Sequence, residues 1–416
     1  MIATTTLPSG LRIVTEAMPG ARSVNAGFWV GVGARDESPE LAGASHFLEH
    51  LLFKGTEARS ASSINRAVDV TGGDMNAFTT AEYTAFHARL PEGRLDLALD
   101  VLSDVVWAPA FRPADVEAER SVILEELLAE EDAPDDRVMT LLDEAVFPDH
   151  PLGAEVLGTR ASVAAMDREA IRAFHARWYR PGNVVVAVAG AVDHDEVVAG
   201  IVGRLPEVGP AEAPVRRPPA APPKPLMVLR RRSEQAHLAI AVRALARADE
   251  DRDALAVLNQ VLGAGPSSRL FEHVREARGL AYTVYSATSA YSDAGALSVY
   301  AGTAPDQAAE VLALLHAELD RMVADGITEE ELAVAAGYLE GSTLLGLEDS
   351  AGRMERIGWS LLLEGQVPSI DEVVGRFRSV TVADVARVID RVLAGTPRSV
   401  AVVGPMSRRT LEATAA

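Results

Sequence analysis

Cysteine is absent from the 416 residues of this chain, which excludes disulfides, thiol nucleophiles and cysteine-ligated zinc. Long apolar runs are absent too, and none approaches the length that a membrane-spanning helix needs. The first residues, MIATTTLPSGLRIVTE, show neither the basic nor the apolar region of a secretory signal. We therefore expect a soluble cytoplasmic protein that does not bind a membrane.

Positive charge is scarce, because 39 Lys and Arg stand against 60 Asp and Glu, for a formal net charge of −21. A nucleic-acid-binding protein needs a basic face that neutralises phosphates, so this charge argues against nucleic acid as a partner. An acidic surface would attract basic peptides, although solubility in water is the simpler interpretation. The high use of alanine and arginine suggests a bacterial source.

A proline-rich run marks the clearest domain boundary. The segment LPEVGPAEAPVRRPPAAPPKP at residues 205–225 favours extended chain, since proline has no backbone N–H to donate. A chain of this length is also too long for one hydrophobic core. We predict an N-terminal domain over residues 1–206, a proline-rich linker over 207–226 and a C-terminal domain over 227–416.

The two halves repeat one order of elements, which suggests an ancestral duplication. Each half has a first strand followed by a helix, then a β-rich pair, long amphipathic helices and a closing apolar strand. Strands that are separated from runs of helices predict an α+β fold. The predicted β segments are residues 23–32, 75–90 and 184–189 in the first half, and 236–244, 281–303 and 399–403 in the second.

The sequence His46-Phe47-Leu48-Glu49-His50 carries the most specific chemical signal. On a helix, two histidines four residues apart lie one turn from each other, so both imidazoles can bind one divalent metal. Glu49 then lies beside the metal, where a carboxylate can take a proton from metal-bound water. This order, H-x-x-E-H, is the inverzincin signature. The second half has no such motif, which favours a functional over a structural role.

A catalytic zinc site has three protein ligands and an open position for water, so the motif is one ligand short. The acidic helix predicted over residues 113–131 offers six glutamates, and spacing alone does not choose among them. Two of them, Glu119 and Glu126, are seven residues apart on one helix face, so one can bind the metal and the other can support a ligand. The six are Glu117, Glu119, Glu125, Glu126, Glu130 and Glu131.

Three segments resemble the pitrilysin–insulysin inverzincin metallopeptidases, in the mitochondrial processing peptidase branch: GASHFLEHLLFKGT, GGDMNAFTTAEYTAFHARL and ERSVILEELLAE. The resemblance extends over most of the chain. It implies that His46, His50 and Glu126 bind one zinc ion per chain. It also implies that Glu49 is the general base and Glu119 a supporting acid. The implied fold is a pair of homologous α/β-roll domains, each a mostly antiparallel sheet with helices packed on one side.

The resemblance also indicates where a peptide would bind. Asn76, Ala77 and Phe78 follow a Gly-Gly pair and are expected to begin an edge strand, to which an extended peptide can add by main-chain hydrogen bonds. An ordinary strand whose Asn76 satisfies a turn is an equal alternative. Glu82 is a candidate for contact with a basic substrate residue, with a solvated surface charge as the alternative.

In the second half, SSRLFEHVREARGLAYTVYSA resembles the arginine–tyrosine element of the same family. Arg275 and Tyr282 match the residues that contact the substrate or the tetrahedral intermediate. A guanidinium and a phenol are suitable donors to an oxyanion at the attacked carbonyl. A helix salt bridge for Arg275 and a core position for Tyr282 are the structural alternatives.

Relatives of this family enclose their substrate in a chamber of four half-units, whereas this chain has two. The resemblance therefore implies a homodimer, or a heterodimer with a related subunit, in which Arg275 and Tyr282 serve the zinc of the partner chain. The predicted function is a zinc endopeptidase that hydrolyses peptides or flexible presequence-like segments. A non-catalytic assembly subunit is one alternative, which the intact ligands and Glu49 disfavour. A zinc hydrolase of non-peptide substrates is another, which the peptide-binding strand disfavours.

Overall fold

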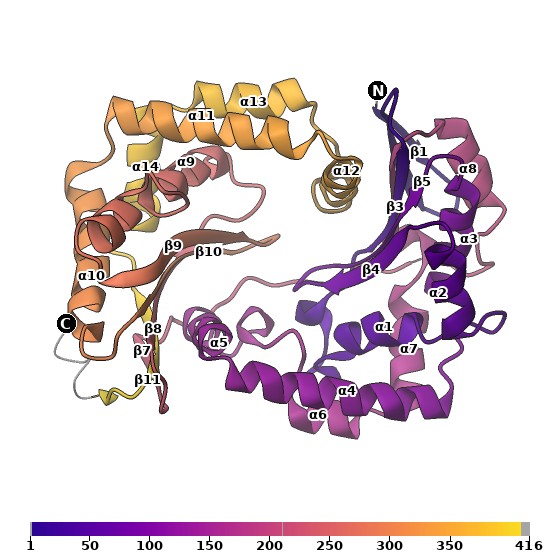
Figure 1. Cartoon of the computed structure of the whole chain (residues 1–416), viewed down its shortest axis with the longest axis horizontal. Helices are drawn as coiled ribbons and strands as arrows, with labels where there is room; N and C mark the ends of the chain where they lie inside the picture. The colour runs from indigo at the N-terminus through magenta and orange to yellow at the C-terminus, as the bar shows by residue number, and fades with distance from the viewer. Residues whose placement is uncertain (1, 210, 409–416) are drawn as a thin grey trace. The chain divides into compact units, whose positions relative to one another are not determined.

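The structure, a computed structural model, describes residues 2–209 and 211–408 and contains two compact units (Figure 1). The first unit comprises Met1–Leu127, Glu155–Val215 and Leu345–Pro368. The second comprises Leu128–Ala154, Arg216–Leu344 and Ser369–Ala416. Each is built on one β-sheet with helices, so the predicted α+β fold of two similar domains is confirmed. The predicted ranges 1–206 and 227–416 assign each half of the chain to one domain. In the structure, residues 128–154 belong to the second unit and residues 345–368 to the first.

The first unit has a six-stranded sheet with the order β1-β2-β6-β3-β5-β4. All neighbours are antiparallel except β2 and β6. β3 lies near the centre of the sheet, and almost every residue in it is therefore buried, whereas β4 is an edge strand. The strands are β1 (Ile2–Thr6), β2 (Arg12–Ala17), β3 (Ser23–Val30), β4 (Asp74–Thr79), β5 (Thr84–Pro91) and β6 (Val184–Gly190).

Most helices of this unit cover one face of the sheet. Alternate residues of β3, such as Val24, Ala26 and Phe28, point into a shared core with apolar side chains of these helices, because successive strand residues face opposite ways. The helices are α1 (Ala44–Leu52), α2 (Ala61–Asp69), α3 (Leu95–Trp107), α4 (Pro113–Asp132), α6 (Arg160–Ala165), α7 (Arg168–Trp178) and α8 (His194–Val202).

The other face of the first sheet is covered by α12 (Ser350–Glu364), which comes from the second half of the chain (Figure 1). Met354 and Ile357 of this helix pack against Trp29. The approach is close at Gly358, where an added Cβ would collide with the Trp29 ring. Polar contacts also hold the helix, since Asn25 Nδ2 donates to Ser350 Oγ at 2.6 Å. We expected helices on one side of the sheet. The structure has most helices on that side and one helix, α12, on the other.

The second unit has the order β7-β11-β8-β10-β9, with β7 and β11 parallel and the other neighbours antiparallel. This is the arrangement of the first sheet without β1, which agrees with the repeated element order. The strands are β7 (Leu226–Arg230), β8 (Ala236–Ala244), β9 (Ala281–Ala290), β10 (Gly295–Thr303) and β11 (Ser399–Gly404).

The helices of the second unit repeat the same plan. α9, α10 and α14 share a core with alternate residues of β8, and α5 from the first half of the chain packs against β8 and β11. The helices are α5 (Pro134–Val146), α9 (Arg252–Leu262), α10 (Ala308–Asp325), α11 (Glu329–Gly346), α13 (Ile370–Ser379) and α14 (Val382–Val392). Each unit therefore contains one helix from the other half of the chain: α12 in the first unit and α5 in the second.

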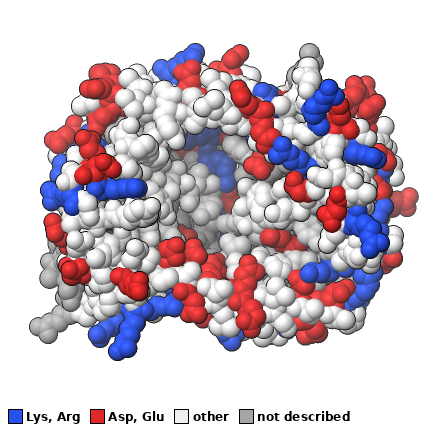
Figure 2. Space-filling model, viewed as in Figure 1, with Lys and Arg blue, Asp and Glu red and all other residues white. Residues whose placement is uncertain are grey.

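No helix among the described residues is both long and apolar enough to cross a membrane. Figure 2 shows acidic side chains spread over the viewed face among fewer basic ones, as the net charge requires.

Candidate metal centre

The motif residues lie on α1, whose apolar side anchors it in the first core. Phe47 and Leu48 are fully buried there, which fixes the rotation of the helix about its axis. His46 and His50 consequently lie on one face, with ring centroids 4.8 Å apart in an edge-to-face arrangement. His46 is buried and His50 is half-buried, so the pair lies at the boundary between core and solvent.

Glu126 of α4 reaches the two histidines. Its Oε2 lies 3.7 Å from His46 Nε2 and 3.5 Å from His50 Nε2. In the described part of the chain, these three residues are the group of acidic and histidine side chains whose ligand atoms converge, all within 4.8 Å of one another. Of the six glutamates that spacing left open, the structure therefore brings Glu126 to the histidines, as the family resemblance implied.

The donor set fits a divalent metal such as zinc. Two imidazole nitrogens and one carboxylate oxygen match the ligand types of catalytic zinc sites. Burial, and next the neighbouring His50, lower the pKa of His46 to about 4, so its ring is neutral at neutral pH, as a metal ligand must be. Nε2 of His46 is the nitrogen that faces Glu126 and could bind the metal, whereas Nδ1 on the other side of the ring is buried without a hydrogen-bond partner.

Glu119, about two turns before Glu126 on the same face of α4, supports His50. Its Oε2 lies 3.0 Å from His50 Nδ1, and its Oε1 lies 2.8 Å from Lys54 Nζ. Because a carboxylate accepts a hydrogen bond here, Nδ1 carries the proton and Nε2 keeps its lone pair toward Glu126 and a metal. The structure thus places Glu119 in the supporting position. Lys54 neutralises this buried carboxylate. The sequence analysis missed it, although it lies in the segment GASHFLEHLLFKGT.

Glu49 has one defined partner, Thr79 at the end of β4. The Thr79 hydroxyl donates to Glu49 Oε2 at 2.6 Å. Burial raises the pKa of Glu49, and the bond from Thr79 opposes this rise because it favours the ionised form. Thr79 was also missed by sequence analysis. Its position directly after Asn76-Ala77-Phe78 was the available signal.

β4 is an edge strand, as predicted for Asn76, Ala77 and Phe78. It pairs only with β5 among the described strands, so its other edge can accept main-chain hydrogen bonds. Asn76 is exposed, and its Oδ1 accepts from the Ala77 amide at 2.9 Å. Phe78 is half-buried against Trp29, with ring centroids 5.7 Å apart. The strand leads directly to Thr79 and therefore to Glu49.

Glu82 does not occupy the position that we expected for a substrate contact. Its side chain is 2 % exposed and lies 2.7 Å from Arg35 Nη1, whose side chain is equally buried. A carboxylate neutralised inside the protein is not available to a basic substrate residue, and it is not a solvated surface charge either. Sequence spacing did not reveal the pair, because its members are far apart along the chain.

Arg275 and Tyr282 lie together in the second unit, whereas the metal centre belongs to the first. Arg275 lies in a short π-helical segment (Phe271–Glu276), and its guanidinium carbon is 5.0 Å from the centroid of the Tyr282 ring. Tyr282 is 77 % exposed, so the alternative of a core position is contradicted. The pair is close enough to act as one element.

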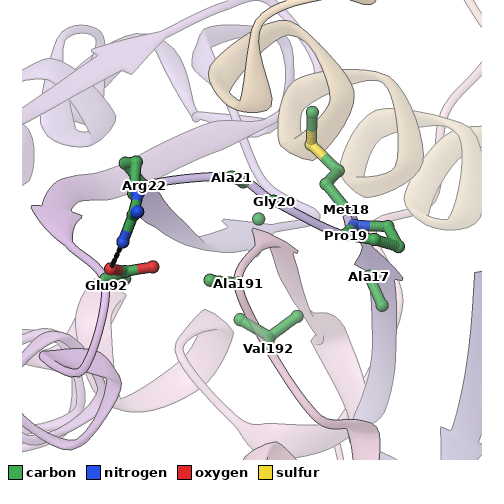
Figure 3. A pocket seen from close by; sticks show the side chains of 10 residues that line it. Ala17, Met18, Pro19, Gly20, Ala21, Arg22, Glu92, Ala191 and Val192 are labelled. Carbon is green, nitrogen blue, oxygen red and sulfur yellow. Dashed lines mark hydrogen bonds and ion pairs between the residues drawn. The ribbon is translucent and has the colours of Figure 1, made fainter.

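A separate hollow of about 490 Å³ lies at the other end of the first sheet (Figure 3). It is lined by residues 17–22 and 190–192 and by Glu92, near the start of β3, whereas Thr79 lies level with the last residue of β3. Its charged groups are Arg22 and Glu92, which form an ion pair at 2.5 Å. Since these charges neutralise each other at the surface, we assign no chemistry to the hollow.

Comparison with protein families gives two matches that together span most of the chain. Residues 12–160, which include the metal centre, match the family described as insulinase (peptidase family M16). Residues 165–337, which lack the motif, match the peptidase M16 inactive domain. The H-x-x-E-H motif thus lies in the region that matches the insulinase family and is missing from the region that matches the inactive domain.

Similar proteins occur in bacteria. An uncharacterized zinc protease of Streptomyces coelicolor is 46% identical over 410 residues, which cover 97% of this chain and 89% of the relative. One from Mycobacterium tuberculosis is 44% identical, with 98% and 94% covered, and one from Bacillus subtilis is 38% identical, with 91% and 93% covered.

Solved structures share the fold. A protease from Helicobacter pylori superimposes with a TM-score of 0.90 at 22% identity, over 97% of this chain and 100% of the other. A Pseudomonas fluorescens structure described as a peptidase M16 inactive domain also gives 0.90, at 21% identity and 98% coverage of both chains.

Proposed function

Because this chain belongs to peptidase family M16, we propose that it is a zinc metalloendopeptidase in which Glu49 is the general base. The observation that carries the proposal is the convergence of His46, His50 and Glu126, with Glu49 on the same helix as the two histidines. A non-catalytic subunit would have no need for a half-buried carboxylate beside such a ligand set.

The residues divide the chemistry among themselves. A zinc ion held by the three ligands would polarise the scissile carbonyl and lower the pKa of a water molecule at its open position. Glu49 takes the proton of the attacking water and passes it to the leaving amine. The buried environment that raises its pKa makes Glu49 a better base, and the bond from Thr79 holds the carboxylate in one orientation. Glu119 holds the His50 ring, and Lys54 balances the charge of Glu119.

The proposed substrates are peptides or flexible, presequence-like segments. The free edge of β4 supports this class, because only an extended chain can add to a strand edge. Asn76, Ala77 and Phe78 would contact the peptide, and its scissile bond would lie beyond Thr79 and close to Glu49. The net negative charge favours basic peptides by long-range attraction, although Glu82 takes no part in it.

The proposed assembly is a dimer, made of two copies of this chain or of this chain and a related subunit. The resemblance to processing peptidases supports it. The bacterial relatives support a bacterial source, and the proposed location is the cytoplasm. In such a dimer Arg275 and Tyr282 would serve the zinc of the partner chain. A mixture of His46→Ala and Tyr282→Phe proteins, each inactive alone, should then recover activity after subunit exchange. No recovery despite proven exchange would exclude sharing between chains.

The function itself is tested by metal analysis and a library of quenched fluorescent peptides. We expect one zinc ion per chain, cleavage that stops on zinc removal and returns when zinc is added back, and no cleavage of folded globular proteins. Stoichiometric zinc without cleavage of any peptide would favour the alternative of a non-catalytic assembly subunit.

A further inference from the structure

The connection between β3 and α1 contains a carboxylate that binds the start of the motif helix. Glu37 Oε2 accepts from the Gly43 amide and Oε1 from the Ser45 amide, each at 2.6 Å. The first amides of a helix have no partner within the helix, and Gly43, its N-cap, has no side chain to satisfy them. Ser45 directly precedes His46, so this contact fixes the backbone next to the first motif histidine.

The same connection is tied to the end of the edge strand. The Ala34 amide donates to the Thr80 carbonyl at 3.1 Å, and the Arg35 amide donates to the Ala81 carbonyl at 2.8 Å. The buried ion pair between Arg35 and Glu82 closes the contact. Thr80 follows Thr79, whose hydroxyl binds Glu49.

These contacts form a closed circuit around the motif helix. One route runs from the start of α1 through Glu37 to the segment with Arg35, and from there to the turn after β4. The other runs directly from that turn, through Thr79, to Glu49 in the middle of α1. A helix held at two points against the same strand end cannot shift without breaking one of these polar contacts.

We infer that Glu37 and the Arg35–Glu82 ion pair are positioning residues of the metal centre. Glu37 sets the placement of His46, and the ion pair sets the placement of Thr79 and thereby of Glu49. None of these residues touches the reacting atoms. The inference rests on the proposed function, because it concerns the same zinc site.

The first test substitutes Glu37→Gln, in which an amide N–H₂ replaces one of the two acceptor oxygens. Burial raises the pKa of Glu37 to about 8, and the Ser45 and Gly43 amides oppose the rise. Measurements at about pH 9 therefore compare a charged Glu37 with an uncharged glutamine. Competition with a colorimetric chelator should show zinc affinity about tenfold weaker, as is typical for loss of a partner behind metal ligands.

Glu372→Gln is the matched control. Glu372 accepts from the Ser369 amide at 2.7 Å at the start of α13 in the second unit, so the chemical change is the same on a helix without metal ligands. Its zinc affinity should equal that of the wild type. Affinities are measured well below the unfolding temperature of each variant. If Glu37→Gln lowers only the melting temperature, the role is merely structural and the inference is overturned. If this variant does not fold, Glu37→Asp replaces it, with an intermediate loss expected.

The second test substitutes Glu82→Gln, which keeps the shape but removes the ion pair. Positioning through Thr79 and Glu49 predicts a kcat about tenfold lower with KM unchanged. A substrate contact would instead raise KM, and only for basic peptides, so that result would overturn the assignment. Variants equal to an active wild type would overturn this inference alone. A wild type that binds no zinc would overturn the proposed function and the inference together.

Discussion

The two sheets share one strand order apart from β1, yet among the described residues a candidate set of metal ligands lies in the first unit alone. In both, a helix follows the central strand, α1 after β3 and α9 after β8, and accepts a hydroxyl bond from the edge strand. Thr79 donates to Glu49 at 2.6 Å in the first unit, and Ser286 donates to Asn259 Oδ1 at 2.7 Å in the second. The fold therefore supplies a position beside the edge strand in each unit, and the side chains decide whether that position has chemistry.

The connections that lead to these helices also differ. Residues 31–43 separate β3 from α1 and supply Glu37, whereas the shorter stretch 245–251 separates β8 from α9. The start of α9 is held by a side-chain ion pair instead, since buried Asp251 lies 2.5 Å from Arg387 of α14. The longer connection ties the start of α1 to the strand end, whereas this ion pair ties the start of α9 to another helix. The connection before the helix therefore contacts the end of the edge strand in the unit that carries the candidate metal centre.

The largest effect that we predict is the loss of catalysis in Glu49→Gln. The amide cannot accept a proton, so the rate of peptide cleavage should fall about 1,000-fold while the zinc content is unchanged. The matching change in the second unit, Asn259→Asp, should alter the rate by less than about twofold, because no ligand set lies beside it. Equal losses in both variants would contradict the assignment of chemistry to the first unit alone.

The next effect concerns the third ligand. Glu126→Gln should weaken zinc binding about 100-fold, measured by competition with a chelator, because a neutral amide is a poorer ligand than a carboxylate. Glu125→Gln, at an exposed position of the same helix, should leave the affinity unchanged. If the two variants lose affinity alike, then a general loss of negative charge on α4 explains the result, and Glu126 is not a ligand.

A third prediction compares glycines on two helices. Gly358→Ala places a Cβ against the Trp29 ring in the contact between α12 and β3, so it should lower the free energy of unfolding by about 2 kcal/mol. Gly337→Ala on α11 meets nothing within 4 Å and should raise stability by up to about 1 kcal/mol, since alanine is the better helix former. Urea unfolding would show shifts of opposite sign. Shifts of the same sign would show that α12 does not pack as described.

The smallest predicted effect depends on pH. Burial lowers the pKa of His175 to about 4, although its hydrogen bond to the Val106 carbonyl acts to raise the pKa. Since the unfolded chain binds a proton near pH 6.5 and the folded one near 4, His175 contributes stability above pH 6.5 that is lost as the pH falls to 4. In His175→Gln this acid-induced loss should be smaller by about 1–2 kcal/mol. Identical pH profiles of melting temperature for both proteins would contradict this account.

Much of the fold could be predicted because its signals are local. The repeated order of strands and helices indicated two similar domains, and the position of Asn76 after a Gly-Gly pair indicated an edge strand. The exchange of α5 and α12 had no such signal. An amphipathic pattern shows which side of a helix is apolar, but it does not show which of two similar sheets that side will cover.

For the candidate site too, local spacing predicted some features and not others. The spacing of His46, Glu49 and His50 indicated a metal-binding helix, because side chains one turn apart on a helix are neighbours whatever the rest of the chain does. The same local rules left six glutamates open for the third ligand. They also suggested a substrate contact for Glu82, whose partner Arg35 lies on a different segment.

The helices, strands and motif could be predicted from the sequence, since they depend on spacings within a few residues. The tertiary structure decided which distant groups meet: Glu126 with the histidines, Thr79 with Glu49, and Glu37 with the start of α1. Such contacts depend on how buried faces pack together, and packing depends on the shape and register of the whole unit. The candidate chemistry can therefore be predicted from a short helix, whereas the geometry of the site depends on the whole fold.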